Sequence, residues 1–178
     1  MATADPQDLS AFEAAYTRGR RARVVGELVP VFAFVALLCF VTGLRPQVLL
    51  MGGASLVLAS IALWRGEAMG RAVYPGLLVG VVPFACSFAG GHLGHVCTGE
   101  ACVSLCMPLC ALGGGLAGLV VARVVRREPR PALAIVMGGL ALAIGSLGCP
   151  HAGLASLTSM GLALVVPVAL ARVFTRSR

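Results

Sequence analysis

Apolar runs of about 18 to 22 residues recur along this chain and are separated by short connections rich in arginine, glycine and proline. The hydrocarbon core of a bilayer is about 30 Å thick, so a helix needs about 20 consecutive apolar residues to cross it. The chain is 58% hydrophobic and only 12% charged, with a mean hydropathy of +0.94. These values exclude a water-soluble domain of 178 residues and predict an all-α integral membrane protein.

The apolar runs predict a bundle of six transmembrane helices. The expected spans are about Val24–Leu44, Gln47–Trp64, Ala72–Ala89, Ala101–Ala122, Pro131–Gly148 and Gly153–Ala171. The first is interpreted as an uncleaved helix, because its apolar run is too long for a signal peptide and no A-x-A site follows it. The expected organisation is an N-terminal cytoplasmic segment (1–23), the transmembrane bundle (24–172) and a short cytoplasmic tail (173–178).

Basic residues predict the orientation of the bundle. The chain has fourteen, all arginines, and thirteen of them fall in the N-terminal segment, two connections and the C-terminal end. Cytoplasmic loops retain Lys and Arg, so both termini are expected in the cytoplasm. Only Arg45 is expected outside. The formal charge of +7 is therefore interpreted as a topology signal with contact to anionic lipid headgroups, and direct nucleic-acid binding is not expected.

Histidine and cysteine gather in the connections on the opposite, outward side. The candidate residues are His92, His95, Cys97, Cys102, Cys149 and His151. Two chemistries fit them. The outer compartment is oxidising, so Cys149 is a candidate for a disulfide with Cys97 or Cys102. Alternatively, all six residues are candidate ligands of a metal, for which zinc or copper suits histidine with cysteine. The spacing matches no standard finger, so zinc is a possible cofactor and not a required one.

Cysteines also occur inside the expected spans. Cys102, Cys106 and Cys110 are spaced four apart and are expected to line one face of the fourth span. The cysteines at 39, 86, 106 and 110 are interpreted as packing residues among small neighbours. Glycine pairs such as Gly76 and Gly80 predict close contacts between helices.

The N-terminal segment predicts a short amphipathic helix. Asp5 and Pro6 are typical of a helix start, and Leu9, Phe12 and Tyr16 then recur at spacings of three and four. About fourteen helical residues are marginal alone in water, so this helix needs a surface to fold against. That surface is either the lipid headgroups or a cytoplasmic partner that binds the Leu9, Phe12 and Tyr16 stripe.

A short N-terminal cytoplasmic segment, six helices, and cysteines about fifty residues apart in two outer turns resemble the NrsF-type bacterial membrane anti-sigma factors. CarR-type six-helix regulators are similar. The resemblance rests on Cys97 or Cys102 with Cys149 and on the Cys149-Pro150 step. It implies a multi-pass protein of the inner membrane that sequesters an extracytoplasmic-function sigma factor. It also implies that Cys149 with Cys97 or Cys102 senses the signal that releases this factor, and that residues 1–23 help to hold it. The additional histidines leave oxidant or metal open as the stimulus.

Two other functions compete with this interpretation. A small transporter or metal-handling protein would use His92, His95, Cys102 and Cys149 as an entry site, but few polar residues fall within the spans. A membrane thiol oxidoreductase would normally carry a C-x-x-C pair, which is absent. No Walker, HExxH or GxSxG motif is present either, so the chain is not expected to be an enzyme.

Overall fold

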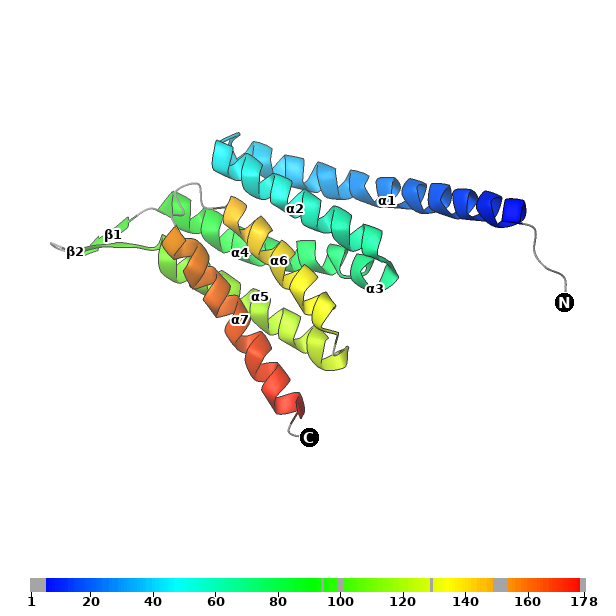
Figure 1. Ribbon diagram of the computed structural model, residues 1–178. Coiled ribbons are helices and arrows are strands. Elements are labelled where there is room, and N and C mark those ends of the chain that lie inside the picture. The colour runs from blue at the N-terminus through cyan, green and yellow to red at the C-terminus, as the bar shows by residue number, and fades with distance from the viewer. Residues whose placement is uncertain (1–5, 94, 99–100, 129, 149–153, 177–178) are drawn as a thin grey trace.

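The computed structural model describes residues 6–93, 95–98, 101–128, 130–148 and 154–176 (Figure 1). Most of these residues are helical. The elements in chain order are α1 (Pro6–Thr42), α2 (Pro46–Arg65), α3 (Glu67–Gly70), α4 (Val73–Leu93), β1 (His95–Thr98), β2 (Ala101–Ser104), α5 (Cys106–Arg127), α6 (Pro131–Leu147) and α7 (Leu154–Arg176).

A long helix lies in each of the six ranges that hydropathy predicts for a span. Within the described residues, four of these helices are long and apolar enough to cross a membrane, namely α1, α2, α4 and α5. The apolar part of α7, Leu157–Val173, and the whole of α6 are shorter. The helical class is therefore confirmed, whereas six membrane crossings stay a prediction.

The central helix of the bundle is α6. It packs against α2, α4, α5 and α7, and ten of its 17 residues are buried. Leu140, Ile144 and Leu147 have no exposed surface. A helix that is apolar on all sides has no face suited to solvent, so it is most stable when neighbours surround it. The core of the molecule therefore forms around α6, with α1 and α7 at the periphery (Figure 1).

Small residues let the helices approach each other closely, as the glycine pairs predict. A Cβ atom added to Gly80 would lie 2.8 Å from Cβ of Ile144, so α4 and α6 meet nearly backbone to backbone. In the same way, Gly114 and Gly118 of α5 pack against the backbone of α7 at Met160 and Leu164. These contacts are of the small-xxx-small type that packs helices in membranes.

One predicted span boundary is wrong. The fourth span was expected to begin at Ala101, but residues 101–104 form strand β2 and helix α5 begins at Cys106. The later start suits Pro108. Because it lacks an N–H group, it fits best in the first helical turn, where no intrahelical acceptor is available anyway. A helix from Ala101 would have placed this proline in its interior. Cys102 therefore does not share a helix face with Cys106 and Cys110.

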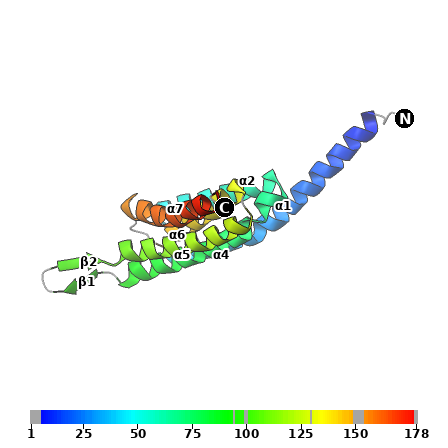
Figure 2. The same cartoon turned by 90° about the horizontal axis from the view of Figure 1, so that it is seen from below.

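The N-terminal segment also differs from expectation. The expected short helix is the first part of α1, which runs without a break for 37 residues through the anticipated boundary between Arg23 and Val24. At 1.5 Å per residue, α1 is about 55 Å long, well beyond the thickness of a hydrocarbon core. Its N-terminal half extends past the other helices (Figures 1 and 2).

Candidate functional site

A two-stranded hairpin forms the end of the molecule that carries the predicted cysteine and histidine site. Strands β1 and β2 are antiparallel and project beyond the ends of α4 and α5 (Figure 2). The register pairs His95 with Ser104 and Cys97 with Cys102. Residues directly opposite each other in an antiparallel pair lie on the same face of the sheet. The hairpin thus brings together two of the three cysteines that the sequence singles out.

His92 lies next to this hairpin, in the last turn of α4. It is exposed, and its ring packs edge-on against Phe88 with 4.3 Å between the ring centroids. His95 is in β1, so the two histidines belong to different elements. Among the described residues, no group of three or more His, Cys, Asp or Glu could hold a metal ion. Zinc binding by the six candidate ligands stays a prediction, since Cys149 and His151 lie outside the described residues.

The residue that precedes Cys149 packs tightly against the backbone of α4. Gly148 ends α6, and a Cβ atom there would meet the carbonyl oxygen of Phe84 and lie 3.0 Å from the amide nitrogen of Phe88. Glycine is needed at this position because the two backbones touch. The last described residue before the second outer connection is therefore seated against the side of α4, below its C-terminal end at Leu93.

The cysteines within α5 face a buried hydroxyl group. Ser87 of α4 and Cys110 of α5 are both buried, and their side-chain oxygen and sulfur are 3.3 Å apart. The sulfur of Cys106 lies 3.9 Å from that of Cys110. This short polar chain joins two helices in the core, where an unpaired hydroxyl would cost free energy. The arrangement agrees with the packing interpretation of Cys106 and Cys110.

At the opposite end of the molecule, Arg20 and Tyr74 join α1 to its neighbours. The guanidinium of Arg20 lies over the ring of Trp64, 5.5 Å from its centroid, and donates a hydrogen bond to the Trp64 carbonyl. The hydroxyl of Tyr74 donates to the carbonyl of Glu27 at 3.3 Å. The first contact joins α1 to the end of α2, and the second joins it to the start of α4.

The predicted partner-binding stripe lies beyond these contacts. Leu9, Phe12 and Tyr16 all fall in α1, on the part of the helix that precedes Arg20. The side chain of Tyr16 is 64% exposed, and residues 15–19 are exposed throughout. Residues 15–19 therefore leave their side chains open on the part of α1 that extends past the other helices (Figures 1 and 2).

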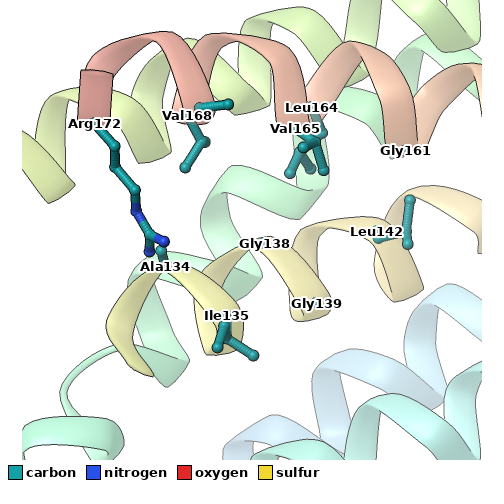
Figure 3. Close-up of a pocket in the computed structure, with 11 residues that line it drawn as sticks. Ala134, Ile135, Gly138, Gly139, Leu142, Gly161, Leu164, Val165, Val168 and Arg172 are labelled. Atoms are coloured by element: carbon teal, nitrogen blue, oxygen red, sulfur yellow. The ribbon is translucent and has the colours of Figure 1, made fainter. Parts of the chain in front are cut away.

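Two grooves open on the surface of the bundle. The larger, about 550 Å³, lies between α6 and α7 and is lined by apolar residues and glycines, with Arg172 reaching across one end toward Ala134 (Figure 3). The smaller, about 420 Å³, is formed at the arginine end by residues that include Arg71, Glu128 and Arg130. The apolar lining of the larger groove suits a hydrocarbon chain or a helix better than a polar substrate.

Sequence reasoning missed the hairpin, although its signal was present. Two four-residue runs that contain the β-branched residues Val96, Thr98 and Val103 are separated by Gly99-Glu100. Two residues with glycine first are typical of a tight hairpin turn. Because β2 is apolar and directly precedes the apolar run of α5, hydropathy assigns it to the fourth span.

Comparison of the chain with protein-family models, curated proteins and solved structures finds no match.

Proposed function

We propose that this chain is a membrane-bound negative regulator of the anti-sigma type, oriented with the arginine end in the cytoplasm of a bacterial inner membrane. In this proposal the protruding part of α1 holds an extracytoplasmic-function sigma factor. The cysteine and histidine end faces outward and receives the signal that releases it. The observation that carries the proposal is the separation of these two features at opposite ends of one bundle, with four helices long enough to cross a membrane between them.

The N-terminal part of α1 needs a surface to pack against, either a protein partner or the lipid headgroups. The shape of α1 favours the protein partner. Fourteen residues, Pro6 to Gly19, precede the Arg20 contact and extend about 21 Å beyond it. An amphipathic helix that lies on headgroups runs in the plane of the membrane. Since α1 continues directly into an apolar span, its N-terminal part instead projects along the axis of that span (Figure 2). A projecting helix with an apolar stripe is typical of helix-in-groove recognition.

Helix α4 supplies a direct physical connection between the two ends. It begins near Tyr74, which bonds to α1, and it ends at Leu93, two residues before β1. It is also packed over much of its length against α5 and α6. Helix α4 thus runs from its bond with α1 at Glu27 to the hairpin, and a packed helix of this kind is a route by which a change at one end can bias the other. This connection supports regulation from the hairpin end.

Transport has less support. Among the described residues, the buried polar side chains are Ser55 and Ser87, and each has a hydrogen-bond partner. Transporters of ions or polar solutes place ionisable groups near the midplane. The groove between α6 and α7 has one ionisable lining residue, Arg172, which lies near the C-terminal end of its helix.

The proposal is tested by measuring whether the purified full chain binds and retains a sigma factor. The substitution Phe12→Ala should weaken retention by at least about tenfold, because truncation of a central apolar anchor commonly costs more than 1.4 kcal/mol. Retention is measured with the tagged chain in detergent against the extracytoplasmic-function sigma factors of its host, each purified separately.

The matched control is Phe32→Ala, which removes the same side chain from the same helix at a position 61% exposed on the apolar span. Retention should survive this change. If no sigma factor binds the unaltered chain, or if Phe12→Ala and Phe32→Ala behave alike, the anti-sigma function is wrong.

A further inference from the structure

We infer that Cys97 and Cys102 form a disulfide with each other across the hairpin, and that this bond, without Cys149, is the redox-active element of the outward end. The inference deepens the proposed function, and only its regulatory consequence rests on that function. The juxtaposition that carries it is the register of β1 and β2, which places these two cysteines directly opposite one another.

The backbone geometry suits the bond. Opposite residues in an antiparallel pair have Cα atoms about 5.5 Å apart when they exchange hydrogen bonds and about 4.5 Å apart when they do not. Disulfides form over Cα separations of about 4.4 to 6.8 Å. Both kinds of pair therefore fall within range, so the bond requires no movement of either strand. Cys97 and Cys102 are the only two cysteines that pair in this way among the described residues.

A bridge from Cys149 would have to join the end of α6 to the hairpin. Gly148, the residue before Cys149, is seated against α4 between Phe84 and Phe88, five residues before that helix ends at Leu93. The hairpin projects beyond the end of α4 (Figures 1 and 2). Cys97 and Cys102 already face each other in the strand register, so the pairing within the hairpin needs no approach of α6 to the strands.

The chemistry is a thiol–disulfide exchange with a low-molecular-weight or protein disulfide as the oxidant. The thiolate of one cysteine attacks a sulfur of glutathione disulfide, for example, and releases one glutathione thiolate. The second cysteine, after losing its proton, attacks the mixed disulfide and releases the other. Two cysteine thiols and one glutathione disulfide thus give one protein disulfide and two glutathione thiols. The protein is oxidised by two electrons and glutathione is reduced by two.

The regulatory consequence follows from the position of the hairpin. It connects α4 to α5, and Gly90 of α4 already contacts the Cα atom of Cys106 at the start of α5. A bond across the strands fixes their pairing and so holds these two helix ends together. Reduction frees the strands to separate. We expect the oxidised and reduced chains to hold the sigma factor with different affinity.

The test is peptide mapping of the full chain in detergent after exposure to glutathione disulfide and alkylation of the remaining thiols. Proteases that cleave after arginine and glutamate cut between the two cysteines at Glu100. They do not cut after Glu128 or Arg130, because proline follows each of these residues. The fragments of interest are 72–100 with Cys97, 101–123 with Cys102, and 128–172 with Cys149. The expected product is 72–100 linked to 101–123. It should be lost on reduction, in Cys97→Ser and in Cys102→Ser, and retained in Cys149→Ser.

The disulfide would be overturned by a link from 128–172 to either of the other fragments, or by no link at all after oxidation. A 72–100 to 101–123 link that persists in Cys97→Ser would also overturn it, because Cys86 would then be the partner. Sigma-factor retention is measured on the same oxidised and reduced samples. If the bond forms and retention stays the same, the disulfide stands and the sensing role in the proposed function is wrong.

Discussion

Gly114 and Gly115 are neighbours in sequence with opposite surroundings. A Cβ atom at Gly114 would meet the carbonyl oxygen of Met160 and lie 3.0 Å from its side chain, whereas at Gly115 it would meet nothing within 4 Å. The first position is therefore a contact between the backbones of α5 and α7. Gly115 lies on the open side of the same helix, so a substitution there changes the stability of the chain only through its helix propensity.

Alanine at these two positions should consequently have opposite effects. Gly114→Ala is expected to destabilise the chain by about 1 to 3 kcal/mol, because α5 and α7 must separate to admit a methyl group. Gly115→Ala is expected to be neutral or to stabilise it by up to about 1 kcal/mol, because alanine is the better helix former. Thermal unfolding in detergent, followed by circular dichroism, measures both. Equal shifts for the two variants would contradict the packing of α5 on α7.

At the scale of one element, α1 joins an apolar span to a projecting helix with no interruption. Its continuity depends on residues 19–26, which contain no proline and remain helical although Gly19 and Gly26 stand at the two ends of this stretch. Arg20 on Trp64 holds this part of the helix at the end of α2. The projecting part should therefore keep a fixed direction relative to the span.

Proline at position 22 should break this continuity. Ala22 is exposed, so Ala22→Pro disturbs the helix itself, at a cost of about 3 kcal/mol, and not a packing contact. Spin labels at Ala15 and Val29, in a background without other cysteines, should give a narrow distance distribution near about 21 Å in the unaltered helix. The distribution should broaden in Ala22→Pro and stay narrow in the control Ala22→Ser. A broad distribution before substitution would mean that α1 is not one helix in solution.

At the scale of the whole molecule, helix α3 and the hairpin lie at opposite ends (Figure 1). The connection before α4 and the connection between α5 and α6 meet at one groove, where Arg71 and Arg130 lie with Glu128. The positive-inside rule predicts that this end faces the cytoplasm. In that proposed orientation the hairpin lies in the outer, oxidising compartment, which the disulfide between Cys97 and Cys102 requires.

Site-directed labelling checks this orientation. In a variant without the native cysteines, a single cysteine at Thr98 should react with an impermeant maleimide in intact cells, because β1 is at the outer end. A single cysteine at Glu128 should react only after the membrane is permeabilised. Reaction at position 128 in intact cells would contradict the proposed orientation. It would mean either that the bundle has the opposite orientation or that the chain crosses the membrane an odd number of times before Glu128.

Much of the helical fold is predictable because its determinants are local. The apolar runs and Pro131 at the start of α6 locate most of the helices to within about five residues, whereas α1 continues far beyond its apolar run toward the N-terminus. Pairs such as Gly76 and Gly80 identify a close helix contact before its partner helix is known. The start of α5 was misplaced because hydropathy averages over a window and does not distinguish an apolar strand from an apolar helix.

The sequence alone determined the class of the protein, the approximate position of its long helices and the gathering of histidine and cysteine in two connections. Only the tertiary structure decided that Cys97 faces Cys102 across a hairpin, that Gly148 is seated against α4, and that α1 continues past the bundle. The reason is physical. Hydropathy and turn signals act between residues close in sequence, whereas strand register and helix neighbours depend on which backbones fit together in space.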